Sequence, residues 1–372
     1  MADERLQAKV RNLLAFAGVA LGGEAPGDIT VHNDLLYRRV LAGGSLALGE
    51  AYMDGWWDST ALDEFFHKVL AAGLDRRVKA RTWLLDALKA RVFNLQKVSR
   101  AFQIGLRHYD IGNDLYRIML DGRMMYSCGY WKNSATLKEA QEAKLDLVCR
   151  KLCLEPGMRL LDIGCGWGGM ARFAAERFGV EVVGVTVSRE QAAYARDYCR
   201  DLPVDIRLQD YRSLEGTFDR IVSIGMIEHV GRKNYRTFME TARRRLTDGG
   251  LFLLQTIGGN RSVAGTDPWI ERYIFPNSML PSVKQLGAAI EGLFVLEDLH
   301  AFGADYDKTL MRWYANFQEG WNRLKDRYGD RFFRMWSYYL LSCAGSFRAR
   351  VNQLWQLVLS PGGVPGGYAA PR

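Results

Sequence analysis

The chain has 372 residues and a mass of 42.2 kDa, a length typical of about two domains. Apolar residues make up 48% and charged residues 25%, which excludes an intrinsically disordered protein. No apolar run reaches the roughly 18 residues of a spanning helix, and residues 13–23, preceded by Asp3 and Glu4, fit an amphipathic first helix better than a signal sequence. The six cysteines form no CxxC pair and no cluster with histidine at metal spacing, so we expect reduced thiols in the cytoplasm and no metal site.

The positive charge is concentrated in one segment. The formal net charge is +8, and the stretch from Arg76 to Arg107 holds nine basic residues against one acid, Asp86, so this stretch alone carries +8. Apolar residues alternate with the basic ones at near-helical spacing, which favours an anionic membrane surface as partner. A solvated helix face or an interdomain linker explains the same charge equally well, and no recognisable motif supports nucleic acid.

The pattern of elements changes along the chain. Residues 1–95 indicate short helices separated by glycine-rich turns, with an aromatic cluster at Tyr52, Trp56 and Trp57, and predict a small helical N-terminal domain. Residues 96–125 are predicted to form a basic linker and the start of a second domain, which then occupies residues 126–360. The proline- and glycine-rich residues 361–372 predict a flexible tail.

The second domain alternates apolar runs with helical patterns. The runs cover residues 159–163, 180–187, 204–208, 218–224 and 251–257. Strands that alternate with helices of this length predict an α/β fold with a doubly wound, mostly parallel, Rossmann-like sheet.

The first predicted strand runs into the glycine-rich sequence Asp162-Ile-Gly-Cys-Gly-Trp-Gly-Gly169, after which a helix begins. Glycines there allow a tight turn and a close approach to a ligand at the sheet edge. Such a turn alone also fits a dinucleotide site or a packed strand–helix corner. Asp162, just before the first glycine, would repel a pyrophosphate and favour a cationic amino-acid group.

The ends of the next two strands sharpen this interpretation. The second strand ends in Gly184-Val-Thr-Val-Ser188, without the acid that a ribose-binding NAD site places there. The third is followed by Gln209-Asp-Tyr211, an acid and an aromatic ring that can hold an adenine. Together these features predict S-adenosylmethionine as cofactor. Ser188 and Gln191 also fit a capping box that starts a helix.

Several distinctive segments carry a family resemblance. They are His108-Tyr-Asp-Ile-Gly-Asn-Asp114, Tyr126-Ser-Cys-Gly-Tyr-Trp131, the glycine loop, Glu228-His-Val-Gly231, the aromatic-rich 267–276, Phe302-Gly-Ala-Asp-Tyr306 and Phe347-Arg-Ala-Arg350. Over nearly its whole length the chain resembles the cyclopropane-fatty-acyl-phospholipid synthases. The resemblance implies a class I methyltransferase domain over residues 126–360, preceded by a helical domain that engages lipid. It also implies methylene transfer to the cis double bond of unsaturated acyl chains in phospholipid, a homodimer, and bicarbonate as base.

The resemblance also assigns residues. Those expected to bind the cofactor are Tyr126, Ser127, Asp162, Gly164, Cys165, Gly166, Gly168, Thr186, Ser188, Gln191, Gln209, Asp210 and Tyr211. Those expected to hold bicarbonate are Cys128, Glu228, Gln255, the backbone amide of Ile257, and Tyr306. The bicarbonate candidates also have ordinary structural explanations: Cys128 as a buried thiol, Glu228 as an acid at a helix start and Tyr306 as a core tyrosine. His229 is expected to be structural.

One position departs from the family pattern. Where the family's strand ends Leu-Leu-His-Thr-Ile, this chain has Leu253-Leu-Gln-Thr-Ile257. Glutamine can donate a hydrogen bond to an anion through its amide, but it cannot titrate as histidine does. A related lipid C-methyltransferase that leaves a methyl or methylene branch therefore stays open as a second hypothesis.

A non-catalytic lipid-binding protein and a base-amine methyltransferase are less well supported. The first would not need an intact glycine loop. The second would carry an Asn/Asp-Pro-Pro turn where this chain has Ser223-Ile-Gly-Met-Ile-Glu228. The sequence predicts a cytoplasmic enzyme, peripherally associated with the inner face of the cell membrane.

Overall fold

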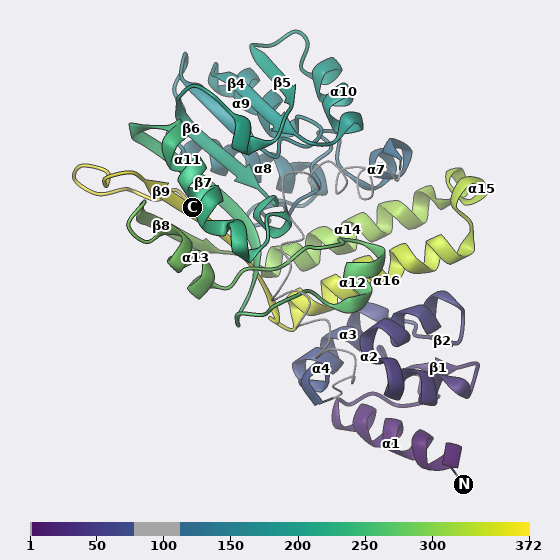
Figure 1. Cartoon of the computed structure of the whole chain (residues 1–372). Helices are drawn as coiled ribbons and strands as arrows, with labels where there is room; N and C mark the ends of the chain where they lie inside the picture. The colour runs from purple at the N-terminus through teal and green to yellow at the C-terminus, as the bar shows by residue number, and fades with distance from the viewer. Residues whose placement is uncertain (1, 78–111) are drawn as a thin grey trace. The chain divides into compact units, whose positions relative to one another are not determined.

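In a computed structural model, the structure describes residues 2–77 and 112–372, and the chain divides into two compact units (Figure 1). The helical unit comprises Met1–Phe93, Ala264–Pro276 and Tyr306–Asn352. The sheet unit comprises Asn94–Val263, Asn277–Asp305 and Gln353–Arg372. Residues 264–276 and 306–352 thus belong to the same unit as the N-terminal segment. From the sequence, both were assigned to the second domain. The basic stretch 76–107 lies outside the residues whose side chains the structure describes.

The helical unit contains a small antiparallel pair of strands besides its helices. Its elements are α1 (Ala2–Phe16), β1 (Thr30–Val31), α2 (Leu35–Met53), β2 (Trp57–Asp58), α3 (Leu62–Ala71), α4 (Leu74–Arg77), α12 (Pro268–Tyr273), most of α14 (Ala304–Gly320), the 3-10 turn η4 (Trp321–Arg323), α15 (Lys325–Tyr328) and α16 (Asp330–Arg348).

Aromatic side chains fill the core of the helical unit. Trp269 of α12 is almost completely buried, and its ring centroid lies 4.4 Å from that of Tyr338 of α16. Gly49 of α2 makes room for it, because a Cβ atom there would lie 2.4 Å from Trp269 Cδ1. This contact holds the 264–276 segment to the N-terminal helices.

The sheet unit is built on a seven-stranded sheet in the order β5-β4-β3-β6-β7-β9-β8. Its elements are α7 (Asn113–Met119), α8 (Leu137–Lys151), β3 (Arg159–Ile163), α9 (Gly169–Phe178), β4 (Glu181–Thr186), α10 (Arg189–Tyr198), β5 (Val204–Leu208), η1 (Tyr211–Ser213), β6 (Phe218–Ile224), η2 (Ile227–His229), η3 (Arg232–Asn234), α11 (Tyr235–Arg245), β7 (Leu246–Gly259), α13 (Val283–Ile290), β8 (Val295–Ala301) and β9 (Asn352–Ser360). The five predicted runs correspond to β3–β7, whose neighbouring strands pair in parallel, while β8 and β9 pair antiparallel.

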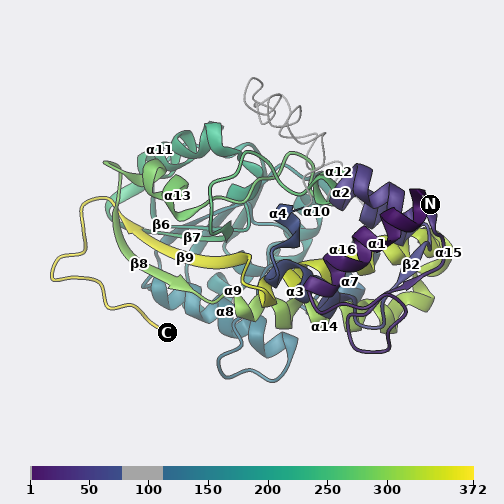
Figure 2. The same cartoon turned by 90° about the horizontal axis from the view of Figure 1, so that it is seen from below.

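Both faces of this sheet are covered by helices, as Figure 2 shows for α8 and α9 on one side and α11 and α13 on the other. Alternate residues of β7 enter different cores: Leu251 and Leu253 pack with α8, α9 and α10, and Phe252 and Leu254 pack with α11 and α13. Such alternation is the two-residue period of a strand, so the continuous apolar run follows from burial on both faces. The predicted doubly wound α/β fold is confirmed.

The strand order reverses between β3 and β6, because β4 and β5 extend the sheet to one side of β3 and β6 and β7 to the other. Ligands of open α/β sheets bind beyond the carboxyl ends of the strands at such a reversal. The glycine-rich loop follows β3 and therefore lies at this position.

The segment 361–372, for which the sequence predicted flexibility, makes specific contacts in the structure. The Tyr368 hydroxyl donates to the Lys151 carbonyl oxygen at 2.7 Å, and Nη1 of Arg372 donates to Asp298 Oδ2 at 2.9 Å. Asp298 also accepts from the buried Lys151 ammonium at 2.9 Å. These contacts tie the segment to α8 and β8.

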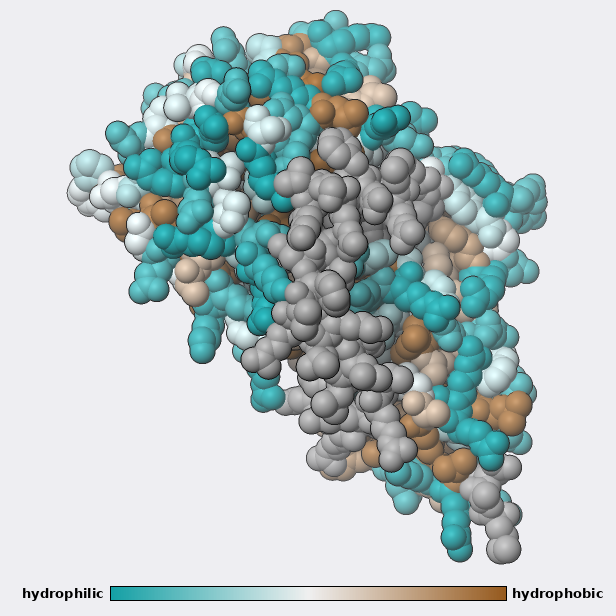
Figure 3. Space-filling model, in the orientation of Figure 1, coloured by the Kyte–Doolittle hydropathy of each residue, from teal (hydrophilic) through white to brown (hydrophobic). Residues whose placement is uncertain are grey.

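The visible surface is mainly hydrophilic, with hydrophobic side chains in small separate patches (Figure 3). Among the helices that the structure describes, none combines the length and the apolar character needed to cross a membrane.

Candidate active site

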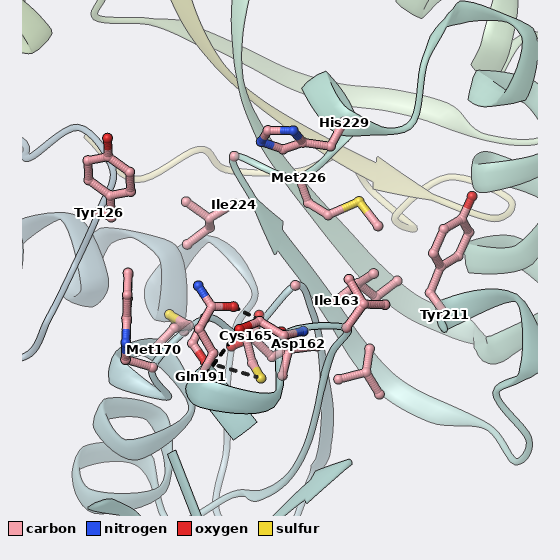
Figure 4. A pocket seen from close by; sticks show the side chains of 18 of the residues that line it. Tyr126, Asp162, Ile163, Cys165, Met170, Gln191, Tyr211, Ile224, Met226 and His229 are labelled. Carbon is pink, nitrogen blue, oxygen red and sulfur yellow. Dashed lines mark hydrogen bonds between the residues drawn. The ribbon is translucent and has the colours of Figure 1, made fainter. Parts of the chain in front are cut away.

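One cavity of the sheet unit is lined by nearly all of the predicted cofactor residues (Figure 4). Its wall includes Tyr126, Ser127, Asp162, Gly164, Cys165, Gly166, Thr186, Ser188, Gln191, Gln209, Asp210 and Tyr211. Gly168 is absent from that wall, and in the structure it is the N-cap residue of α9. The cavity gathers the residues that follow β3, β4, β5 and β6, which is the position expected from the strand order.

The glycine-rich loop after β3 needs glycine for its backbone. Gly164 has a φ of 87° and Gly166 a φ of 55°, both in the left-handed region that other residues rarely adopt. A Cβ atom on Gly164 would also lie 2.9 Å from Met226 Cγ, across the cavity wall. The loop therefore brings its backbone to the cavity without side chains that would fill it.

Asp162 carries a carboxylate that lacks a partner within the described part of the chain. The residue is 2% exposed, and its Oδ2 atom accepts no hydrogen bond there. Burial raises the pKa of Asp162 to about 7, and the positive charge of Lys144 opposes this rise. A buried oxygen without a donor costs free energy, so a ligand ammonium group fits this position. The amino group of S-adenosylmethionine is such a group.

The corner after β4 is held by hydrogen bonds of its own. Ser188 Oγ accepts from the Gln191 backbone N–H at 3.2 Å and so caps α10. The Gln191 side chain accepts from Thr186 Oγ1 at 2.9 Å, so the predicted capping box is only half formed. The side-chain carbonyl oxygen of Gln191 already accepts from Thr186. The side-chain NH₂ group of Gln191 is therefore the part that can donate to a ligand hydroxyl.

Asp210 and Tyr211, predicted to hold an adenine, lie in the cavity wall but also contact protein groups. The Asp210 carboxylate accepts from Nε and Nη2 of Arg212 at 2.8 and 2.6 Å. The Tyr211 ring is 7% exposed and lies 5.3 Å from the Phe238 ring. An adenine amine would therefore share the Asp210 carboxylate with Arg212. This is possible because each carboxylate oxygen has a second lone pair that can accept a hydrogen bond.

Tyr126 and Ser127 come from a loop far from the strands in sequence. Figure 4 shows Tyr126 and Tyr211 on opposite sides of the cavity, with Asp162, Cys165 and Gln191 gathered between them. Ser127 Oγ accepts a hydrogen bond from the Lys144 ammonium at 3.0 Å.

Of the residues predicted to hold bicarbonate, Glu228, Gln255 and Ile257 lie on or beside β7 and away from the cavity wall. Glu228 Oε1 accepts from the Ile257 N–H at 2.7 Å, and burial raises the pKa of Glu228 to about 7. Gln255 is 1% exposed, and its Oε1 atom accepts from Gln356 Nε2 at 2.9 Å. Cys128 is fully buried. None of these residues belongs to the cavity wall.

Two parts of the predicted bicarbonate set differ from the expectation. The Ile257 amide already donates to Glu228, so it orients that carboxylate in this structure. Tyr306 belongs to the helical unit, where its ring lies 4.7 Å from that of Phe347 and 5.9 Å from that of Trp313.

His229 lines the cavity, although we expected a structural role for it. Burial lowers its pKa to about 4, so the imidazole is neutral at physiological pH. Its position next to Glu228 in the same motif was a signal that sequence analysis did not use. Among the described residues, no group of His, Cys, Asp and Glu could hold a metal ion.

The match of the chain to known proteins agrees with this geometry. The family model described as mycolic acid cyclopropane synthetase matches residues 96–357. Cyclopropane-fatty-acyl-phospholipid synthase of Escherichia coli strain K12 is 53% identical over 373 residues, which cover 100% of this chain and 97% of that protein. The chain belongs to the cyclopropane synthase family. It is accordingly an S-adenosylmethionine-dependent methyltransferase.

Two further relatives give the range of this family. A probable fatty acid methyltransferase of Pseudomonas putida is 36% identical, over 68% of this chain and 67% of that protein. A crystal structure of a mycolic acid cyclopropane synthase with SAH and CTAB superimposes with a TM-score of 0.65 at 33% identity, covering 69% of this chain and 97% of that one.

Proposed function

We propose that this enzyme transfers a methylene group from S-adenosylmethionine to the cis double bond of unsaturated acyl chains in membrane phospholipids. The observation that carries the proposal is the 53% identity to the Escherichia coli synthase, which extends over the whole chain. The helical unit is therefore matched together with the sheet unit. The probable fatty acid methyltransferase, in contrast, matches 68% of the chain.

The residues of the cavity fit the cofactor. When bound, S-adenosylmethionine supplies an electrophilic methyl group on a sulfonium centre. The Asp162 carboxylate would take its ammonium group, the Gln191 amide its ribose hydroxyls, and the ring of Tyr211 would lie against its adenine. An alkene is a neutral nucleophile that needs no deprotonation, so the remaining task of the protein is to place it in line in a water-free slot.

The group around Glu228 is proposed to hold a bicarbonate ion that accepts the proton released on ring closure. With its pKa near 7, Glu228 is partly protonated at neutral pH and can then donate to an anion. The Gln255 carbonyl is occupied by Gln356, which leaves the Gln255 amide donors for the ion. The family resemblance adds Cys128 and Tyr306 to the proposed set.

A second candidate function rests on Gln255. Glutamine cannot accept the proton that a histidine at this position could carry, which favours a related lipid C-methyltransferase that leaves a methyl- or methylene-branched chain. The product of the reaction distinguishes the two functions.

The test is mass spectrometry of phospholipid acyl chains after incubation with vesicles of unsaturated phospholipid, methyl-deuterated S-adenosylmethionine and bicarbonate. We expect each modified chain to gain a CD₂ unit, since one deuteron leaves with the base, and its fragmentation to show a ring. A gain of CD₃, which indicates a methyl branch, or a gain of CD₂ without a ring in the fragmentation, which indicates a methylene branch, would establish the branching function instead. No gain in mass, with cofactor binding intact, would reject both.

We further propose that the enzyme is cytoplasmic and homodimeric and binds the inner face of the membrane through the basic stretch 76–107. Neutralising Arg76, Arg77, Lys79 and Arg81 should weaken binding to anionic vesicles and reduce its salt dependence. Neutralising the three arginines in the last turn of α11 is the control for loss of charge elsewhere. Equal effects of both changes would contradict a specific role of the stretch.

A further inference from the structure

Helix α8 carries buried polar side chains along one face. Gln141, Lys144 and Lys151 are each 0% exposed, and their spacing of three and seven residues places them on one stripe of the helix. A buried lysine needs a partner, because its charge is costly to desolvate. Lys151 has one in Asp298, at 2.9 Å. Lys144 faces the cofactor side of the unit and is not explained by the packing of the helix.

Gln141 and Lys144 together hold the loop that carries Tyr126 and Ser127. Gln141 Nε2 donates to the Ser127 carbonyl oxygen at 2.7 Å, and Lys144 Nζ donates to Ser127 Oγ at 3.0 Å. One helix therefore fixes both the backbone and the side chain of Ser127. Because Tyr126 and Ser127 line the cavity, the two hydrogen bonds to Ser127 set the position of one wall of the cavity.

The charge of Lys144 acts on the other side of the cavity. Burial lowers the pKa of Lys144 to about 8, against the raising effect of Asp121, Cys128, Asp162 and Cys149, so the ammonium is mainly protonated at pH 7. Asp121 is itself occupied by the N–H groups of Arg123 and Met125, at 3.0 and 2.9 Å. Asp162 receives no hydrogen bond at Oδ2 from the described residues, and Lys144 acts on it only through its charge.

Within residues 2–77 and 112–372, the other titratable groups that interact with Asp162 do not supply a positive charge. The carboxylate of Asp162 acts on Cys165 and Cys199, and burial raises the pKa of both thiols, which keeps them neutral near pH 7. Among these described groups, Lys144 is therefore the one whose loss would most change the charge state of Asp162.

We propose that Lys144 is a positioning residue of the cofactor site: its ammonium fixes Ser127 and supplies the positive charge that acts on the Asp162 carboxyl group. The inference rests on the proposed role of Asp162 at the cofactor's ammonium group. Lys144 acts on the cavity through Ser127 and Asp162. It thereby links the loop of Tyr126 and Ser127 to the end of β3.

The test measures binding of S-adenosylhomocysteine by calorimetry between about pH 5.5 and 8.5, which requires no turnover. In the wild type, affinity should fall as the pH is lowered through the pKa of Asp162, because a protonated carboxyl cannot pair with the ligand's ammonium. Lys144→Met should move the midpoint of this fall upward by about one pH unit and reduce affinity at pH 7 by about fivefold, because the ionised fraction of Asp162 falls from about one half to about one tenth. Lys144→Arg, which keeps the charge, should restore the midpoint.

Lys151→Met is the matched control, since it removes a second buried lysine from the same helix and should destabilise the protein without moving the midpoint. Lys144→Gln, also neutral, replaces Lys144→Met if the latter does not fold. A neutral Lys144 variant with the wild-type midpoint would overturn the proposal, as would an equal shift in Lys151→Met.

Asp162→Asn separates this inference from the proposed function. If Asp162→Asn loses affinity and its pH dependence while the Lys144 variants behave as wild type, Asp162 keeps its role and the inference about Lys144 fails. If Asp162→Asn binds like the wild type, the role of Asp162 fails, and the inference about Lys144 fails with it.

Discussion

Asp162 and Glu228 are two buried carboxylates of the same sheet unit, at the end of β3 and just after β6, and burial raises the pKa of each to about 7. Within the described residues each has one oxygen that accepts no hydrogen bond, Oδ2 of Asp162 and Oε2 of Glu228, but different groups act on the two carboxyls. Asp162 is opposed by the charge of Lys144 and receives no hydrogen bond at Oδ2 within the described residues. Glu228 receives the N–H of Ile257 at 2.7 Å.

This difference separates two kinds of site. A carboxyl group with a cation acting on it and a free oxygen in a cavity is suited to a cationic ligand, because positive charge favours its ionised form. A carboxyl group stabilised by a neutral N–H, and half protonated near pH 7, can accept or donate a hydrogen bond and is suited to an anion or a proton transfer. Substitutions at the two sites should therefore affect binding and turnover in different ways.

The largest effect is expected from Glu228→Ala. Alanine removes the proposed hydrogen-bond donor to bicarbonate and the acceptor of the Ile257 N–H, so turnover should fall by about 10³-fold, while affinity for S-adenosylhomocysteine stays within about threefold. Steady-state kinetics and calorimetry on the same protein check this. Tyr306→Phe should show the same pattern with a smaller loss. Parallel losses of turnover and affinity in either variant would contradict a role at the base.

Asp162→Asn should show the opposite pattern. Loss of the charge-assisted hydrogen bond to the ligand's ammonium is expected to lower affinity for S-adenosylhomocysteine by about 100-fold. Calorimetry at pH 8 measures the effect, and Asp210→Asn is the comparison at the proposed adenine end of the cavity, where a smaller loss is expected because Asp210 is already bonded to Arg212. An affinity loss larger for Asp210→Asn than for Asp162→Asn would reverse the assignment.

The raised pKa of Asp162 also predicts how stability depends on pH. The folded state holds this proton more tightly than the unfolded chain, so the resulting stabilisation is fully present below about pH 4 and is lost as the pH rises through 7. Cofactor-free Asp162→Asn should therefore be more stable than the wild type by on the order of 2 kcal/mol at pH 8. The gain should shrink toward pH 5. Denaturant unfolding at both pH values tests the sign, and a gain that grows toward low pH would exclude it.

The smallest effect is expected at Gln255. Gln255→Ala removes the proposed donor to bicarbonate and the acceptor of Gln356, so turnover should fall by about tenfold and recover partly at high bicarbonate. Turnover at increasing bicarbonate concentrations measures this. Gln356→Leu, which removes only the group that orients Gln255, should lose less. Identical bicarbonate dependence in Gln255→Ala and the wild type would argue against an anion at this position.

The central strands and the cofactor loop could be predicted from local sequence. The five runs of β3–β7 and the loop after Asp162 are recognisable because a strand buried on both faces is a short apolar run and a left-handed turn requires glycine. The residues after each strand could be predicted to share one cavity, because parallel strands bring their carboxyl ends to one edge.

Contacts between distant segments could not be predicted in this way. Nothing local to α8 shows that Lys144 reaches Ser127, or that Lys151 meets Asp298, 147 residues later. The docking of residues 361–372 and the grouping of 264–276 with the N-terminal helices are of the same kind.

The sequence by itself determined the α/β fold, the cofactor loop and the family, since each depends on local periodicity or on a contiguous motif. Only the tertiary structure decided which buried polar groups face one another: Lys144 acting on Asp162, Ile257 on Glu228 and Gln356 on Gln255. The physical reason is that the pKa of a buried group depends on its desolvation and on neighbouring charges and donors, which packing brings from separate parts of the chain.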